Sequence, residues 1–224
     1  IAYKNVAMDT GCIPQRSDAS VSREEKQAII DERVSMHGFR RGNIINSSGI
    51  SIFDGNNYSD REYVVQAMQG NVYVSEPLVS KITGERSIIV AAPLYSQGRH
   101  GSRVVGVVYF VPPETFLNDI VCSIKTGESS KAYMINKTGD TIADVTLDTI
   151  TTQNIEREAQ SDSSLKELAA IHASMRQGQT GFDSFSSSDG ERFAAYAPVA
   201  GTDGWSVAVT TLKSEYMADT NFGM

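Results

Sequence analysis

One ten-residue pattern occurs twice in this chain, 90 positions apart, and it constrains the fold more than any other feature. Residues 45–54 and 135–144 share isoleucine, asparagine, glycine, isoleucine and aspartate at equivalent positions. Each stretch has an apolar run, a short Asn-x-Ser/Thr-Gly turn in which glycine can adopt a positive φ, and a second run, which is typical of a β-hairpin. A repeat of about 90 residues is too long for a solenoid. The pattern therefore predicts two similar domains in tandem.

The closing parts of the two halves also correspond. In the first half, residues 88–94 and 106–110 flank a glycine-containing turn, and in the second half residues 193–199 and 205–209 do the same. The first segment of each pair carries an Ala-Pro step. Because apolar runs bounded by such turns are typical of paired strands, each half is expected to close with two antiparallel strands.

Helical segments are expected between these strands. In residues 165–177, apolar side chains recur at three- and four-residue spacing, which favours a helix that covers one face of a sheet, with His172 at the edge of that face. We expect Ser163-Ser164 to cap this helix and Asp60 to cap a helix over residues 61–69. Further helices are expected over residues 1–10, over 23–36 with Ser22 as the cap, over 114–124, and from residue 213 onward.

Composition excludes some classes of partner. The 224-residue chain has a formal charge of −7 and no basic stripe interleaved with aromatic residues, so a nucleic-acid partner is not expected. No apolar run approaches the roughly 18 residues of a membrane span, and the first residues are neither an initiator Met nor a signal peptide. We therefore expect a segment taken from a longer protein.

Cysteine and histidine offer no metal site. Cys12 and Cys122 form no CxxC pair, and they are either two separate thiols or one long-range disulfide. His37, His100 and His172 are isolated from one another and from acidic clusters, so neither a metal nor a cofactor is expected. Neither Gly-x-Ser-x-Gly nor Gly-x-x-x-x-Gly-Lys occurs, and no enzyme activity is expected.

Several short motifs together resemble a known family. In the first half they are Tyr-Ser-Asp-Arg-Glu-Tyr at 58–63, Val-Tyr-Val-Ser-Glu-Pro at 72–77, Thr-Gly-Glu at 83–85, Ala-Pro at 92–93 and Val-Gly-Val-Val at 105–108. In the second half they are Gly-Gln-Thr-Gly at 178–181, Tyr-Ala-Pro at 196–198 and Gly-Thr-Asp-Gly-Trp-Ser-Val-Ala-Val at 201–209. Their order and spacing resemble the double Cache (dCache) sensor family across nearly the whole chain.

The resemblance implies an α+β fold of two tandem PAS-like antiparallel-sheet sandwiches with a long N-terminal helix. It implies an N-terminal helical segment, a membrane-distal subdomain, a connecting helix, a membrane-proximal subdomain and the start of a C-terminal helix towards the membrane, at residues 1–42, 43–113, 114–130, 131–212 and 213–224. It also implies an extracytoplasmic location, a tether to the membrane and a homodimer in the full-length receptor.

The ligand is expected in the distal subdomain. The amino-acid-binding branch of the family uses an Arg-x-Trp-Tyr element and a later aspartate, whereas this chain keeps Arg61 and Tyr63, lacks the second aromatic residue, and has no acid near Val111. A guanidinium pairs well with a carboxylate, so we expect a carboxylate-bearing small molecule. The candidate ligand-binding residues are Arg61, Tyr63, Tyr73, Ser75, Tyr58, Tyr109 and Asp54.

Other interpretations stay open. Arg61 could pair only with Asp60 or Glu62 on the surface, and a tyrosine on a sheet face is more often core than ligand contact. A methyl-accepting chemotaxis protein is the expected receptor class, with a histidine kinase or a diguanylate cyclase as alternatives. A structural or interaction module without a ligand would instead have a filled distal core.

Overall fold

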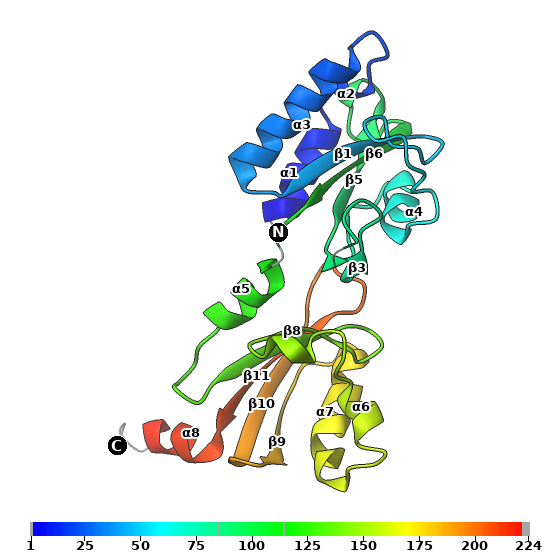
Figure 1. The fold of residues 1–224 in the computed structure, drawn as a ribbon. Helices are drawn as coiled ribbons and strands as arrows, with labels where there is room; N and C mark the ends of the chain where they lie inside the picture. The colour runs from blue at the N-terminus through cyan, green and yellow to red at the C-terminus, as the bar shows by residue number, and fades with distance from the viewer. Residues whose placement is uncertain (1, 85, 114, 221–224) are drawn as a thin grey trace. The chain divides into compact units, whose positions relative to one another are not determined.

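The computed structural model describes residues 2–84, 86–113 and 115–220. The chain divides into two compact units, residues 1–114 and 115–224 (Figure 1). Each unit is built around an antiparallel sheet with helices on its faces. This confirms the two tandem domains that the repeat predicts and the α+β fold that the resemblance implies.

The sheet of the N-terminal unit has the strand order β1-β6-β5-β2. The two central strands are paired along most of their length, from Val90 opposite Phe110 to Leu94 opposite Gly106. A separate two-stranded hairpin, β3 with β4, lies in the long connection between β2 and β5. The strands are β1 (Arg41–Asn46), β2 (Tyr73–Val74), β3 (Leu78–Val79), β4 (Arg86–Ser87), β5 (Val90–Tyr95) and β6 (Val104–Val111).

Helices cover both faces of this sheet. In Figure 1, α1 (Ala2–Gly11) and α3 (Arg23–His37) lie on one side, and α4 (Glu62–Met68) lies on the other. The N-terminal segment is helical, as expected, but α2 (Pro14–Ser17) and the turns beside it divide it. The capping prediction for α3 is confirmed, because the Ser22 hydroxyl accepts from the backbone N–H of Glu25, whose carboxylate accepts from the N–H of Ser22.

Tight packing fixes α1 against the sheet. A Cβ added at Gly11 would lie 2.0 Å from the carbonyl oxygen of Pro93, so only glycine allows the end of α1 to approach β5 this closely. Nearby, the buried guanidinium of Arg16 donates to the carbonyl oxygen of Thr10 at 2.7 Å and to that of Ile29 at 3.3 Å. Arg16 thus joins α1, α2 and α3.

The two copies of the repeated pattern form the same turn. In the first copy, the Asn46 side-chain oxygen accepts from the backbone N–H groups of Ser48 and Ile50 at 2.9 and 3.0 Å. In the second copy, the Asn136 oxygen accepts from those of Thr138 and Asp140 at 3.0 and 2.9 Å. The glycine of each turn has a positive φ, 80° in the first copy and 85° in the second. The shared asparagine and glycine are therefore the residues that the turn requires.

The segments after the two turns differ. In the second copy, β7 and β8 pair as the expected hairpin. In the first copy, the second run forms only isolated bridges, Ile45 to Ser51 and Ile50 to Asn57, so the prediction of a full hairpin is wrong there. The Ser51 hydroxyl accepts from the backbone N–H groups of Phe53 and Asp54, both at 3.1 Å, and these bonds turn the chain away from β1.

The sheet of the C-terminal unit has the strand order β8-β7-β11-β10-β9. Its strands are β7 (Lys131–Ile135), β8 (Thr141–Asp144), β9 (Gly181–Ser187), β10 (Gly190–Pro198) and β11 (Ser206–Leu212). Its helices are α5 (Phe116–Ser123), α6 (Ile155–Glu158), α7 (Lys166–Arg176) and α8 (Lys213–Thr220), with short 3₁₀ turns at Leu147–Thr149 and Ser163–Leu165.

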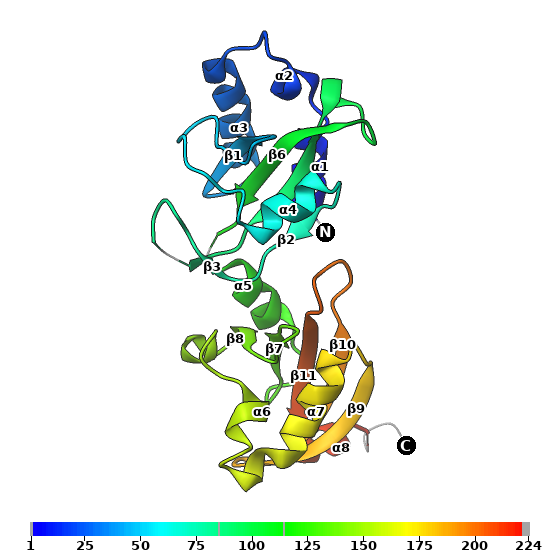
Figure 2. The ribbon, with the colours of Figure 1, turned by 90° about the vertical axis from the view of Figure 1, so that its right-hand side faces the viewer.

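Helix α7 lies across one face of this sheet, as Figure 2 shows. Ile171 and Met175 of α7 pack against Phe185, Ala194 and other side chains of that face. Helix α5 packs against β7 and β8 within the same unit.

The predicted caps of two helices differ from those in the structure, and the two cysteines form no disulfide. Asp60 does not cap α4: Arg61 occupies the N-cap position without a side-chain bond, and Asp60 instead pairs with Lys81 at 2.5 Å. The predicted serine pair does not cap α7: Leu165 occupies its N-cap position without a side-chain bond, and Asp162 caps the 3₁₀ turn before it by accepting from the N–H of Ser164. Cys12 and Cys122 are both free thiols.

The end of the C-terminal sheet leads directly into a helix. Strand β11 ends at Leu212, and α8 begins at the next residue, Lys213. The Glu215 carboxylate in α8 accepts from the backbone N–H of Glu128 at 2.6 Å and from the N–H of Ser129 at 2.9 Å. The first turn of α8 is therefore tied to the segment that precedes β7.

Candidate functional site

Three of the predicted tyrosines form one aromatic cluster in the N-terminal unit. The ring of Tyr109 on β6 makes edge contacts with the ring of Tyr63 on α4, at a centroid distance of 5.4 Å, and with that of Tyr58, at 6.2 Å. All three rings are buried and belong to the core between the sheet and α4. The predicted residues 58, 63 and 109 are thus brought together.

Asp54 is connected to this cluster through hydrogen bonds. Its carboxylate accepts from the Tyr58 hydroxyl at 3.1 Å and from the side-chain amide of Asn43 at 2.9 Å. The Asn43 amide also lies 3.3 Å from the Tyr109 hydroxyl. Burial raises the pKa of Tyr58, Tyr63 and Tyr109 above the ordinary value, so all three hydroxyls carry their protons at neutral pH.

Three cationic side chains meet at the same place. Arg61 at the start of α4 donates to the carbonyl oxygen of Val79 at 3.2 Å, and Arg41 at the start of β1 donates to the Ser80 hydroxyl at 2.8 Å. Lys81 donates to the carbonyl oxygen of Asn57 at 2.9 Å, besides its ion pair with Asp60. Residues 79–81, which comprise the last residue of β3 and the two residues after it, are thus held by Arg41 and Arg61 and carry the third cation.

A cavity of about 10 Å³ lies among these groups. Such a volume has room for about one water molecule. Its lining consists of the cations Arg41, Arg61 and Lys81, the three tyrosines of the cluster, and Leu78, Ser80, Ile82 and Ile89.

The remaining predicted residues lie elsewhere in the N-terminal unit. Tyr73 is half-buried on β2 and packs against the aromatic core, outside the lining of the cavity. Ser75 is buried, and its hydroxyl donates to the carbonyl oxygen of Glu76 at 2.8 Å and accepts from the N–H of Ile89 at 2.9 Å. Its contacts join neighbouring backbone segments. Asp54 reaches the cluster only through Tyr58 and Asn43.

A larger cavity, of about 270 Å³, lies in the C-terminal unit. Tyr133 on β7, Asp144 on β8 and Arg192 on β10 contribute from the sheet, and His172 on α7 contributes from the helix that covers it. Further lining residues are Lys131, Ala132, Thr146, Thr149, Gln153, Ile155, Leu168, Phe185, Ser187 and Thr210.

The Cache domain model dCache_1 matches residues 6–220, almost the whole chain. The chain belongs to the Cache domain family. Among curated proteins, no sequence matches it. Domains of this family are sensory ligand-binding modules, not catalytic ones, and form the extracytoplasmic part of membrane receptors.

Solved structures similar to this Cache chain include an extracellular domain and the ligand-binding domains of chemoreceptors. The extracellular domain of a protein described as a histidine kinase, mmHK1S-Z3, has a TM-score of 0.70 at 14% identity, over 100% of this chain and 91% of that one. The ligand-binding domain of the Pseudomonas aeruginosa PAO1 amino acid chemoreceptor PctB, in complex with L-Arg, has a TM-score of 0.67 at 16% identity, over 100% and 89%. That of the Pseudomonas fluorescens chemoreceptor CtaA, in complex with L-leucine, has a TM-score of 0.64 at 12% identity, over 96% and 86%. At these identities the likeness concerns the fold alone.

Sequence reasoning missed several residues of the Cache chain that line the two cavities. Arg41 and Lys81 lie beside Arg61 because Arg41 contacts Ser80, 39 positions later, and Arg61 contacts Val79, 18 positions later. His172 was expected at the edge of its helix face, yet it is 1% exposed and bonded to Tyr133. The sequence signal that could have indicated a cation in this cavity is the Arg40-Arg41 pair, whose second residue begins β1.

Among the described residues, no helix is both long and apolar enough to span a membrane. In the same part of the chain, no three His, Cys, Asp or Glu side chains gather in an arrangement that could hold a metal ion.

Proposed function

We propose that this chain is the sensor region of a chemotaxis receptor, and that its N-terminal unit binds a small carboxylate among Arg41, Arg61 and Lys81. One observation carries the proposal. Arg41 and Arg61 line the same cavity, and neither pairs with an acidic side chain among the residues that the structure describes. Two guanidinium groups that form no salt bridge with a described acidic side chain favour an anion from outside the chain.

The surrounding groups suit a carboxylate. Tyr58, Tyr63 and Tyr109 keep their protons at neutral pH and so can donate to an anion, while their rings exclude water. A carboxylate held by a guanidinium in a partly dry pocket forms charge-assisted bonds, which are about twice as strong as neutral ones. Lys81 already has the Asp60 carboxylate, so the two arginines are the expected principal contacts.

Binding requires residues 79–81 to move, because the present cavity has a volume of only about 10 Å³. In this arrangement Arg61 holds the carbonyl oxygen of Val79, and Arg41 holds the Ser80 hydroxyl. A ligand carboxylate would replace both of these neutral acceptors. The ligand then favours an arrangement in which residues 79–81 are released, and this difference in affinity between two arrangements is what signalling requires.

Calorimetric titration with a panel of mono- and dicarboxylates tests the proposal. Each acid is compared with its amide, which has nearly the same shape but no charge. We expect a carboxylate to bind at least tenfold more tightly than its amide, and the Arg41→Ala variant to lose that preference. Equal affinities for acid and amide throughout the panel would contradict a carboxylate site in this unit.

A histidine kinase is the second candidate for the receptor class, because the extracellular domain of mmHK1S-Z3 has a similar fold. The chemotaxis assignment is supported by the similar folds of PctB and CtaA and by the motifs of the second half. Glutamate methylation of the full-length receptor is expected for a chemotaxis receptor. Histidine autophosphorylation with ATP would instead identify a kinase.

A further inference from the structure

The cavity beside Tyr133 and His172 in the C-terminal unit differs from that of the N-terminal unit in size. Its volume is about 270 Å³, against about 10 Å³ in the N-terminal unit. Ligand pockets in proteins have volumes of roughly 300–1,000 Å³, and this space, just below the lower end of that range, has room only for a small metabolite. The sheet forms its floor, and α6, α7 and the connection from residue 145 to 153 form its walls.

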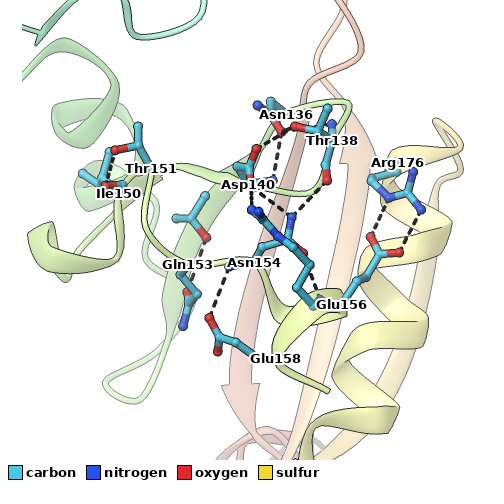
Figure 3. A network of polar contacts seen from close by, with 12 residues as sticks. Asn136, Thr138, Asp140, Ile150, Thr151, Gln153, Asn154, Glu156, Glu158 and Arg176 are labelled. Carbon is cyan, nitrogen blue, oxygen red and sulfur yellow. Dashed lines mark hydrogen bonds and ion pairs between the residues drawn. The ribbon is translucent and has the colours of Figure 1, made fainter. Parts of the chain in front are cut away.

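A network of polar contacts holds those walls in place (Figure 3). The Asn154 side-chain amide, at the start of α6, donates to the carbonyl oxygen of Thr138 and to the Asp140 carboxylate, both at 3.0 Å. Glu156 on α6 accepts two bonds from the Arg176 guanidinium on α7, at 2.5 and 2.8 Å. The turn after β7, α6 and α7 are thus joined around the cavity.

The Asp144 carboxylate lines the cavity without a cationic partner among the described residues. One Asp144 oxygen accepts from the N–H of Thr146 at 2.7 Å, and among the described residues no cation pairs with this carboxylate. The cations that line the cavity, Arg192 and Lys131, instead lie 2.9 and 4.0 Å from the carboxylate of Asp189. Asp144 is therefore a half-buried anion without a counter-ion.

His172 does not supply the missing positive charge. Its imidazole is 1% exposed, and burial lowers its pKa to about 4, so the ring is neutral at neutral pH. Its Nε2 lies 2.9 Å from the Tyr133 hydroxyl, whereas its buried Nδ1 has no hydrogen-bond partner among the described residues. The cavity thus combines a carboxylate, a neutral imidazole and the ring of Tyr133.

We propose that the C-terminal unit carries a second ligand site, in this cavity, which binds a small molecule through a cationic amine held by Asp144. An ammonium group forms an ion pair with the Asp144 carboxylate and neutralises its charge. It also gains a cation–π contact when it lies over the Tyr133 ring. The site is independent of the carboxylate site proposed in the N-terminal unit, since it uses none of the same residues.

The test is an NMR titration of the intact chain labelled with ¹³C-histidine. The chain has three histidines, and the His172→Gln variant identifies the His172 signal. The probes are 1,4-diaminobutane and ethanolamine, each compared with the corresponding diol, which replaces every amine by a hydroxyl. We expect saturable shifts of the His172 signal with the amines and none with the diols.

Matched variants locate the binding. Asp144→Asn is expected to raise the Kd for the amine by at least about tenfold, because a charge-assisted contact is lost. Asp148→Asn, an exposed acid of the same connection outside the cavity, should leave the Kd unchanged. Thr149→Trp fills the cavity from its loop side and should abolish the shifts of the His172 signal. This variant tests the site independently if Asp144→Asn does not fold.

Three outcomes would overturn the site: no saturable His172 shift with either amine, equal shifts with amine and diol, or equal Kd values for the native chain and Asp144→Asn. Arg61→Ala should bind the amines normally. This variant separates the two sites, because the carboxylate site can fail while amine binding persists, and the reverse also holds.

Discussion

The hydroxyl oxygen of Tyr133 on β7 lies 2.9 Å from Nε2 of His172 on α7, inside the C-terminal unit. The two rings are also in contact, at a centroid distance of 5.3 Å. A strand and the helix that covers it are thus joined by a polar pair in a buried position. Because the imidazole is neutral there, its environment makes the stability of this unit sensitive to acid.

The first prediction concerns that sensitivity. Burial lowers the pKa of His172 from 6.5 to about 4 in the folded chain. Between these two pH values the unfolded chain binds the proton more readily, so the free energy of unfolding falls as the pH is lowered from 6.5 towards 4. We expect a loss of about 2 kcal/mol between pH 8 and pH 5 from this residue alone, measured by urea unfolding.

His172→Gln should flatten that pH dependence, although the variant is less stable at pH 8 because the contact with Tyr133 changes. His100→Gln is the matched control, since His100 is exposed, and it should retain the slope. Identical slopes in both variants would argue against a buried neutral imidazole at position 172.

The second prediction concerns Arg61. Its replacement by alanine removes a charged donor from the proposed carboxylate site, which is expected to weaken binding by about 1.5–3 kcal/mol, roughly ten- to hundredfold in Kd. Calorimetry measures the change with the carboxylate that binds best. Arg99→Ala, an exposed cation outside the cavity lining, should have no effect, and unchanged affinity in Arg61→Ala would refute the assignment of this residue.

The third prediction separates backbone strain from steric crowding at two glycines. Gly49 has a φ of 80°, and a Cβ added there would lie 2.4 Å from the Cβ of Ser59. Gly55 has a φ of 74° with no atom within 4 Å of an added Cβ. Gly55→Ala should therefore cost about 1–2 kcal/mol from the left-handed backbone alone, whereas Gly49→Ala should cost clearly more. Thermal unfolding measures the loss of stability in each variant. Equal losses would show that Ser59 moves away from the added Cβ without a cost in stability.

The fourth prediction concerns Asn154, which is 5% exposed. Its amide donates to Thr138 and Asp140, and its side-chain oxygen accepts from the N–H of Arg157 at 3.1 Å. Asn154→Ala breaks all three contacts and should lower the free energy of unfolding by about 1–3 kcal/mol. Gln160→Ala, an exposed position shortly after α6, is the control and should stay within about 0.5 kcal/mol of the native chain.

The features that could be predicted from sequence depend on neighbouring residues. The turns at Asn46 and Asn136 were predictable because each asparagine bonds to backbone groups within four residues. The capping box of Ser22 and Glu25 is equally local. A short pattern contains all the residues that such a contact needs.

The features that escaped prediction depend on distant residues. Asp60 has the sequence of a helix cap, but Lys81, 21 positions later, takes its carboxylate. Arg41 reaches the cavity through Ser80, 39 positions away, and His172 is buried by Tyr133 at the same separation. In the candidate site, sequence reasoning therefore found Arg61 and the three clustered tyrosines but not the other cations beside them.

The direct passage from β11 into α8 has a mechanical consequence. A flexible linker would absorb a change in sheet twist, but no residue intervenes between Leu212 and Lys213, and Glu215 holds the first turn of α8 to Ser129. We therefore expect a rotation of β11, the central strand of this sheet, to move the axis of α8 with it.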